Sequence, residues 1–416
     1  MEEKKQIVFL EPWPTIMVYK MARMLKKKGY YTVSIRILES DKSSDRFYKD
    51  AFDEIISFNL VFFKIEPKNI LPILSSVMRR MKSMFKAWIQ ILKLRPYIIF
   101  ARATPSWPCK WTKILFKKYP VVYFTYDVRS SKASPSKKIM TEVHKIPEFE
   151  LKAEKFCFEK SDGILCTGGE GQLDYLSEEI FGKGFKVKNE KLNFYSYCLK
   201  DFLVPINKDK LSKKDKEIHT VYIGSVGSIG LREDNYLFEQ FKSIINQGIH
   251  IHIYATLNTA TKTSFVDSST EQGKELLQSK YFHVHPPLGP QEIIKEISKY
   301  DFGLLLSSVK IQGNYPIYSI GNKISSYLEA GIPCIYEEKS TMINRLMKHY
   351  NLQLPFREKN LKERLKKLNY PLWEKKIIKA REDFLMEKQF PRLESFIEKV
   401  RKKHNNSYKE RGEIKL

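Results

Sequence analysis

Residues 321–333, GNKISSYLEAGIP, combine the residue types that could do chemistry in this chain. A glycine turn is followed by a lysine, a short helical pattern with one acid, and a glycine–proline end. Free amides at a helix start can hold a phosphate, and a lysine beside them adds a point charge. The pattern predicts a binding site for a sugar nucleotide, with Gly321, Asn322 and Lys323 at the diphosphate. The Glu329 carboxylate on the same helix could accept hydrogen bonds from a ribose diol.

A second glycine-rich stretch, GSVGSIG at 224–230, follows the apolar run at 219–223. Glycines there let phosphates or an acceptor approach the backbone, although a tight turn explains them equally well. His283 and His285 flank one valine, so alternation places both on one face of a strand. His285 is therefore a candidate for contact with a nucleotide base, with an ordinary surface histidine as the alternative. The donor-side candidates from these stretches are Gly224, Ser225, Gly227, Arg232 and His285.

The first half of the chain offers candidates for an acceptor. The apolar run at 121–126 ends at Asp127, and Arg102 closes the preceding one. Polar residues at the carboxyl ends of parallel strands face the crevice where ligands bind. Asp127 could orient an acceptor hydroxyl or act as a base, with a structural Asp–Arg pair as the alternative. Glu170 follows another strand end, and Trp13 lies in the first strand–helix loop, where it could stack on an acceptor sugar.

Length and composition bound the possibilities. A chain of 416 residues with 42% hydrophobic residues is long enough for two domains, each with its own core. The apolar runs are too short to cross a membrane, and the start lacks the features of a signal peptide. The five cysteines are scattered without a CxxC pair, which favours reduced thiols in a cytoplasmic protein and argues against a zinc site.

The net charge of +25 is uneven, with the excess in residues 1–150 and 351–416 and near neutrality at 201–350. This favours an anionic partner of the first half, although a lysine-rich thermophile composition is an alternative. The predicted helix 69–94 carries apolar residues every three or four positions, several lysines and arginines, and no acid. Such helices bind anionic membrane surfaces, whereas an ordinary sheet-covering helix would bury the same stripe. No nucleic-acid motif is present, so no nucleic-acid partner is expected.

Strand and helix patterns alternate nearly throughout, which favours an α/β fold with parallel sheets. The polar stretch KDKLSKKDKE at 208–217 is the predicted linker between domains. The expected organisation is an acceptor-binding domain at 1–207, a nucleotide-sugar-binding domain at 208–385, and a C-terminal helix with a polar tail at 386–416.

The order of these segments resembles GT-B glycosyltransferases, in particular family 4, the retaining group 1 enzymes. Four segments carry the likeness: FEKSDGILCTGG at 158–169, VYIGSVG at 221–227, the stretch from YFHVHPPLG to DFGLLLSS at 281–308, and GNKISSYLEAGIPCIYE at 321–337. The resemblance implies two Rossmann-like domains with a facing cleft and C-terminal helices that return to the first domain. It also implies metal-independent hexosyl transfer, with a nucleoside diphosphate sugar as co-substrate and no cofactor.

The chain departs from the family's pattern at the donor site. The two glutamates that the family carries eight residues apart fall on Tyr318 and Ser326. Glu329 is the nearby acid, about one helical turn after Ser326, so it would reach the same ligand from roughly the same face. The family's arginine after the first strand falls on Ser225, which leaves Lys323 or Arg232 to supply the charge for the diphosphate.

The sequence therefore predicts a cytoplasmic glycosyltransferase, peripheral at the inner face of the cell membrane. Its expected donor is a nucleoside diphosphate sugar, and its expected acceptor is lipid-linked or a glycan in cell-surface polysaccharide or glycolipid synthesis. A nucleotide-sugar epimerase of the same fold and a GT-B-like scaffold without catalysis are the alternatives.

Overall fold

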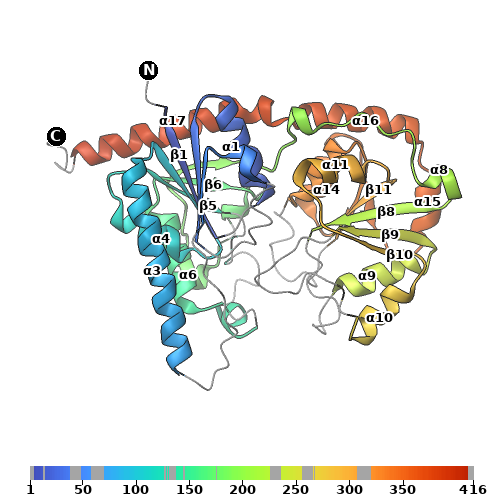
Figure 1. Cartoon of the computed structure of the whole chain (residues 1–416), viewed down its shortest axis with the longest axis horizontal. Helices are drawn as coiled ribbons and strands as arrows, with labels where there is room; N and C mark the ends of the chain where they lie inside the picture. Colours follow the sequence, from blue (N-terminus) through green and yellow to red (C-terminus); the bar gives the residue numbers. More distant parts are fainter. Residues whose placement is uncertain are drawn as a thin grey trace. The chain divides into compact units, whose positions relative to one another are not determined.

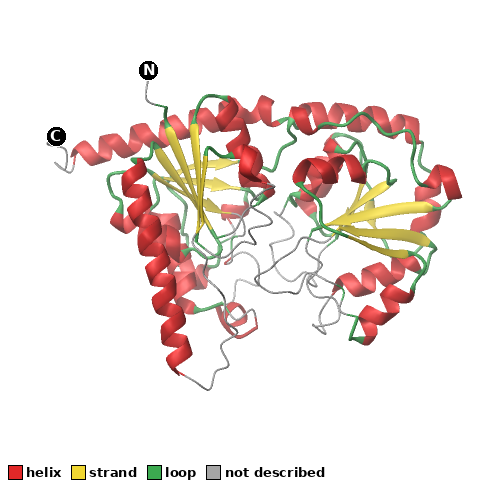
Figure 2. Ribbon diagram, viewed as in Figure 1, coloured by secondary structure: helices red, strands yellow, loops and turns green. Residues whose placement is uncertain are grey.

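The computed structural model describes residues 4–12, 15–37, 48–57, 70–125, 128, 130, 137–143, 146–174, 176–224, 236–254, 266, 268–306 and 320–410 (Figure 1). Within these ranges it describes only the backbone at 70–77, 79–81, 83, 139 and 143. The described strands form two parallel sheets, and helices cover both faces of each sheet (Figure 2). The predicted α/β class is therefore confirmed.

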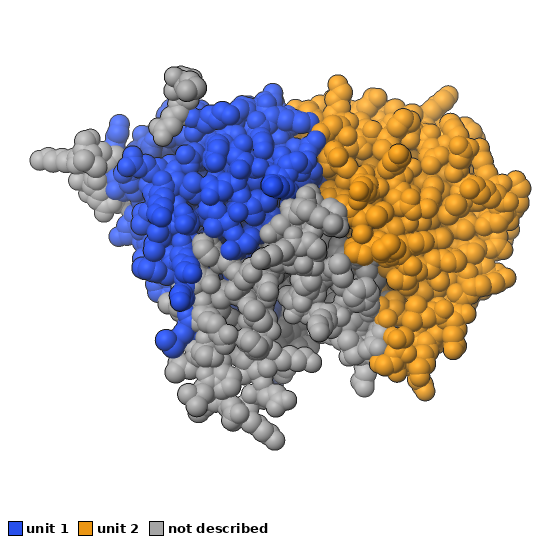
Figure 3. All heavy atoms as spheres, viewed as in Figure 1, with its two compact units in different colours: residues 1–195, 313–315, 389–416 blue, residues 196–312, 316–388 orange. Residues whose placement is uncertain are grey.

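The described residues divide into two compact units (Figure 3). The described residues of unit 1 fall within 1–195 and 389–416, and those of unit 2 within 196–312 and 316–388. The chain thus returns to unit 1 through its last helix, as the GT-B resemblance implied. The first boundary lies before the predicted one, because the backbone at Leu199 and Val204 donates hydrogen bonds to Glu329 of unit 2. These contacts join residues 196–207 to unit 2.

Unit 1 is built on a seven-stranded sheet in the order β3-β2-β1-β4-β5-β6-β7. Most of its strands are buried on both faces, which explains why they read as continuous apolar runs. The strands are β1 (Gln6–Glu11), β2 (Tyr31–Arg36), β3 (Glu54–Ser57), β4 (Ile98–Arg102), β5 (Val121–Thr125), β6 (Gly163–Cys166) and β7 (Glu190–Asn193). The main helices are α1 (Ile16–Lys27), α3 (Ile70–Leu94), α4 (Trp107–Leu115), α6 (Glu148–Lys160), α7 (Glu178–Phe181) and α17 (Met386–Glu410).

Unit 2 is built on a six-stranded sheet in the order β10-β9-β8-β11-β12-β13. Its strands are β8 (Ile218–Ile223), β9 (Ile249–Tyr254), β10 (Phe282–His285), β11 (Phe302–Leu305), β12 (Cys334–Glu337) and β13 (Pro355–Phe356). Its helices are α8 (Ser212–Asp215), α9 (Tyr236–Ile245), α10 (Glu271–Gln278), α11 (Pro290–Ile297), α13 (Lys323–Glu329), α14 (Thr341–His349), α15 (Leu361–Lys366) and α16 (Tyr370–Asp383).

In each sheet the strand order reverses once, between β1 and β4 in unit 1 and between β8 and β11 in unit 2. At such a switch point the loops after the two strands lead in opposite directions and leave a crevice for ligands. The two reversals therefore mark where each unit is built to bind.

The polar stretch predicted as a linker is part of unit 2. Lys210 donates hydrogen bonds from Nζ to the carbonyl oxygens of Ser298 and Tyr300 at 2.7 and 2.9 Å. Ser212 donates from Oγ to Asp301 at 2.5 Å. The stretch is rich in polar residues because it satisfies carbonyls and a carboxylate at the edge of the fold. Among the described helices, none is long and apolar enough to span a bilayer.

Candidate functional site

The start of α13 lies over the carboxyl ends of β8 and β11, at the switch point of unit 2. Gly224, directly after β8, has φ +108, and a Cβ there would lie 3.1 Å from Lys323 Cε. A Cβ on Gly321 would lie 2.8 Å from Leu305 Cδ1, at the end of β11. Gly224 requires glycine because of its positive φ, and Gly321 brings the backbone close to Leu305 at the end of β11. Three sequence-predicted donor residues, Gly224, Gly321 and Lys323, therefore meet at one crevice.

Among the described residues, Lys323 brings a charged group to this crevice. Its Nζ lies 3.4 Å from the centroid of the Tyr222 ring, a cation–π contact. Burial lowers the pKa of Lys323 to about 7. Among the described residues, no carboxylate forms an ion pair with it. A partly neutral amine over an aromatic ring will take up a proton when an anion binds beside it, so the site favours a phosphate ligand.

Hydrogen bonds fix α13 to the sheet beneath it. Tyr327 donates from its hydroxyl to the carbonyl oxygen of Leu304 at 2.8 Å and contacts that of Val221 at 3.3 Å. Ser325 donates from Oγ to the Asn322 carbonyl at 3.0 Å. Ser326, the position of a family glutamate, is buried with 6% exposure. The helix is thus held rigidly at the ends of β8 and β11.

Glu329 makes a structural contact in place of the predicted ribose contact. Its side chain has 0% exposure, and Oε1 accepts a hydrogen bond from the Leu199 amide at 2.7 Å. Its own carbonyl accepts from Val204 at 3.1 Å. The face of α13 that carries Glu329 packs against residues 199–204, so the carboxylate anchors that segment. We therefore correct the sequence interpretation, which placed Glu329 on the ligand face.

His285 is engaged in a cluster of histidines. Its Nε2 lies 2.9 Å from Nδ1 of His252, and its ring stacks on Tyr254 with centroids 4.6 Å apart. The sequence indicated that His283 and His285 share a face but missed the three further histidines that join them. Six other predicted positions lie outside the described residues: Trp13, Asp127, Ser225, Gly227, Arg232 and Tyr318.

The switch point of unit 1 carries a buried acidic residue and a buried basic residue. Arg102 ends β4 with 3% exposure, and Glu11, which the sequence reasoning missed, ends β1 with 1% exposure. The register that pairs Leu10 with Ala101 makes them neighbours. Glu11 accepts a hydrogen bond from Ser34 Oγ at 2.7 Å and lies 3.9 Å from Arg36 Nε. The sequence contained a signal for Glu11, because this acid directly follows the apolar run at 6–10. Asp127 is a candidate on the same ground, since it follows the apolar run at 121–126.

Two acids of α6 hold the loops that follow β4 and β5. The Ser106 amide donates to Glu150 Oε1, and the Ser130 amide donates to Glu154 Oε2 at 3.0 Å. Both glutamates are buried. Their spacing of four residues on one helix was the signal that the sequence reasoning missed. Glu170, the weaker acceptor-side prediction, is exposed in the loop after β6.

Comparison with known proteins places this geometry in a wider group. A family model described as glucosyltransferase 3-like, C-terminal domain, matches residues 246–365, within unit 2. No curated protein matches the sequence. The fold is similar to that of a sucrose-phosphate synthase from Thermosynechococcus elongatus, with a TM-score of 0.59, 11% identity, and coverage of 98% of this chain and 99% of that one.

Two further solved structures are similar over nearly their whole length. A glycosyltransferase from Rickettsia africae gives a TM-score of 0.55 at 11% identity, covering 96% of this chain and 99% of that one. A UDP-GlcNAc 2-epimerase from Methanocaldococcus jannaschii, in complex with UDP-GlcNAc and UDP, gives a TM-score of 0.50 at 11% identity. The match covers 92% of this chain and 93% of that one. The chain therefore has the GT-B fold, which confirms that prediction, while the likeness to family 4 in particular stays a prediction.

Proposed function

We propose that this protein is a metal-independent glycosyltransferase that binds a nucleoside diphosphate sugar in unit 2 and transfers the hexose to an acceptor bound by unit 1. The observation that carries the proposal is Lys323. It is a partly buried amine, packed against Gly224 and Tyr222 at the switch point of a parallel sheet. The match of residues 246–365 to a glucosyltransferase-like domain supports the same assignment.

In the proposed reaction, the bond between the anomeric carbon and the diphosphate breaks as the acceptor oxygen bonds to that carbon. The departing diphosphate gains negative charge, which the Lys323 ammonium and the amides at Gly321 and Asn322 stabilise. The acceptor hydroxyl gives its proton to a base, for which Asp127 is the candidate, and Arg102 is the second catalytic candidate. Ser225, Gly227, Arg232, Tyr318 and Ser326 remain donor-side candidates, and Trp13 and Glu170 acceptor-side candidates.

The exposed surface of α3 supports a lipid-linked acceptor at an anionic membrane. Met84, Ala87 and Ile91 are buried in the core of unit 1, as in an ordinary sheet-covering helix. A second apolar stripe remains exposed at seven-residue spacing, with Met78 at 65%, Phe85 at 62% and Leu92 at 54%. Such a stripe on a surface helix is typical of insertion into a bilayer interface.

Lysines beside this stripe supply attraction to anionic lipid. Lys82, Lys86 and Lys93 are exposed on the same helix. Each cation near an anionic surface contributes about 1 kcal/mol. The apolar and basic components together favour a protein that works at the inner face of the cell membrane on glycolipid or polysaccharide precursors.

A thermal-shift panel of UDP-, GDP-, ADP- and CMP-sugars tests the donor site, because a ligand that binds the native state raises Tm. Transfer is then measured from the selected donor, radiolabelled in the sugar, to extracted membrane lipids. Lys323→Met should remove both the Tm shift and the transfer. No Tm shift with any of the four would contradict the proposal. Isomerised sugar from donor alone would favour an epimerase, and binding without either product would favour an inactive scaffold.

Vesicle sedimentation tests the membrane component. We expect binding to phosphatidylglycerol vesicles and none to phosphatidylcholine vesicles. The double variant Phe85→Ser/Leu92→Ser should lose most of this binding. Leu372→Ser, at a residue of α16 with 47% exposure, is the matched control for loss of an exposed apolar side chain. Equal binding by both variants would remove α3 from the proposal.

A further inference from the structure

Five of the eight histidines of the chain gather on one face of the unit 2 sheet, which we call the histidine array. They come from three neighbouring parallel strands: His219 of β8, His250 and His252 of β9, and His283 and His285 of β10. The register pairs His219 with His250 and His252 with His283. Because side chains of a strand alternate between faces, this register places all five rings together. The proposed transfer reaction uses none of these contacts.

One line of hydrogen bonds begins at an acid. Asp215 Oδ2 lies 2.8 Å from His219 Nε2, whose Nδ1 lies 2.9 Å from His252 Nε2. His252 Nδ1 lies 2.9 Å from His285 Nε2. An ionised carboxylate only accepts hydrogen bonds, so in the neutral form of His219 Nε2 carries the proton and Nδ1 carries a lone pair. That lone pair points at the next ring.

A second, shorter line repeats the arrangement. Glu217 accepts a hydrogen bond from His250 Nε2, so Nδ1 of His250 also carries a lone pair. This Nδ1 lies 2.8 Å from His283 Nε2. The His219 and His250 rings stack with centroids 4.3 Å apart. A carboxylate on the far nitrogen of an imidazole, with the near nitrogen free to ligate, is the outer-sphere arrangement typical of histidine ligands to metals.

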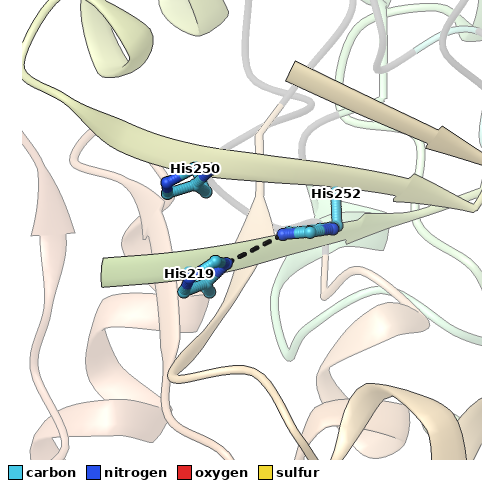
Figure 4. Close-up of side chains that lie close together, drawn as sticks. All are labelled: His219, His250 and His252. Atoms are coloured by element: carbon cyan, nitrogen blue, oxygen red, sulfur yellow. Dashed lines mark hydrogen bonds between the residues drawn. The ribbon is translucent and has the colours of Figure 1, made fainter. Parts of the chain in front are cut away.

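Three of the rings converge closely enough to share one ion. His219, His250 and His252 each offer a ligand nitrogen, and these atoms all lie within 4.8 Å of one another (Figure 4). Zinc–nitrogen bonds of about 2.0–2.1 Å in a tetrahedron place the nitrogens roughly 3.3 Å apart. The 2.9 Å pair would open slightly, and the other pairs, which are at most 4.8 Å apart, would close by up to about 1.5 Å when the ion binds.

The three candidate ligand atoms are all imidazole nitrogens. Neutral imidazole suits borderline ions such as Zn²⁺, Ni²⁺ and Cu²⁺ rather than Mg²⁺ or Ca²⁺.

We propose that His219, His250 and His252 bind a borderline divalent metal ion, Zn²⁺ in the first instance, at a structural site in unit 2. His252 ligates through Nε2 once its proton resides on Nδ1 and is donated to His285. His283 or water completes the tetrahedron. The ion would join β8 to β9 through side chains, in addition to the backbone ladder between the two strands.

This site is separate from the sugar-nucleotide crevice. His219 precedes Gly224 by five residues of β8, which spans about 16 Å of extended chain. Tyr222, which lies under Lys323, is three residues from His219 and so points to the opposite face of the strand. The metal therefore takes no part in the proposed transfer, and the two proposals can fail independently.

Titration of the untagged, EDTA-treated chain with Co²⁺ tests the proposal, because Co²⁺ with nitrogen ligands in a tetrahedral site shows visible d–d bands. We expect one Co²⁺ per chain, displacement by Zn²⁺ and not by Mg²⁺, and a Tm raised by Zn²⁺. His250→Gln should abolish the bands, and His349→Gln, an exposed histidine of α14 outside the array, should leave them unchanged.

Glu217→Gln is the second variant, because the Glu217 side chain is 37% exposed and we expect its replacement to leave the fold intact. Removal of an outer-sphere partner should weaken the metal about 10- to 100-fold. Absence of d–d bands in the wild-type chain, or equal affinity in Glu217→Gln and His349→Gln, would overturn the metal site. The histidine array would then be a hydrogen-bond network alone.

Discussion

Binding of the donor should depend on pH through Lys323. Burial lowers the pKa of this amine to about 7, so it is about half charged at pH 7 and mostly neutral at pH 8.5. A diphosphate needs the ammonium form, so the apparent Kd should scale with 1 + 10^(pH − 7). This factor rises about 16-fold between pH 7 and pH 8.5, equivalent to roughly 1.6 kcal/mol of binding free energy.

Isothermal titration calorimetry measures this dependence directly, with the member of the nucleotide-sugar panel that raises Tm most. The diphosphate of a UDP-, GDP- or ADP-sugar stays fully ionised over this range, so the slope reports the protein. Repeating the titration at pH 8 in two buffers of different ionisation enthalpy should show uptake of about 0.9 proton per donor bound.

Two variants separate charge from shape. Lys323→Arg carries a guanidinium that stays charged over the whole range, so its Kd should not change with pH. Lys323→Met carries no charge, so its affinity at pH 7 should fall at least about 10-fold and its pH slope should vanish. A wild-type Kd that changes less than threefold from pH 7 to pH 8.5 would refute the reasoning. An unchanged slope in Lys323→Met would assign the titration to another group.

Three further outcomes follow from buried contacts. Glu329→Ala leaves the Leu199 amide unpaired and should lower the free energy of unfolding in urea by about 1–3 kcal/mol. The Kd for the donor should change less than about twofold. A large loss of donor affinity would instead restore the assignment of Glu329 to the ribose. His252 has a folded pKa of about 2, below its ordinary 6.5, so the folded state binds fewer protons and stability falls as the pH drops below 6.5. By pH 5, in EDTA, this group should lower the free energy of unfolding by about 2 kcal/mol, and this loss should be absent in His252→Gln. An equal loss in the wild-type chain and in His252→Gln would assign the pH dependence to another group. Gly331→Ala should cost about 1–3 kcal/mol, because Gly331 has φ +71 and a Cβ there would lie 2.5 Å from Ile206; a neutral effect would contradict that conformation.

The pattern of apolar residues along the chain predicted the fold well, because the same type of strand burial and the same alternation of strands with helices recur throughout the chain. Strands such as β4 and β5 are buried along their whole length, so their apolar runs stand out between helical segments. Alternation of such runs with helices leaves few arrangements other than parallel sheets. The glycine–lysine crevice was also predictable, because Gly321 and Lys323 lie within one short segment that forms a turn and a helix start.

Contacts between distant segments were beyond the sequence. The helical period placed Glu329 on the face of Ser326, but the partner that occupies that face, Leu199, lies 130 residues earlier. The histidine array shows the same limit. The alternation at 250–252 and 283–285 was visible, whereas its convergence depends on β8, β9 and β10 being neighbours, which the topology decides.

The distribution of charge now has a physical interpretation. If the excess of +25 served the nucleotide, it would lie in the segments that carry the predicted donor residues, yet residues 201–350 are close to neutral. Among the described residues of unit 2, the crevice has the amine of Lys323, whose pKa is lowered by partial burial, where salt screens charge less than in open solvent. The exposed lysines of α3 lie in solvent, where salt screens them strongly. The proposed donor site and the proposed membrane surface therefore use positive charge in two physically different ways. Binding at the donor site depends on the protonation of Lys323, and binding at the membrane depends on ionic strength.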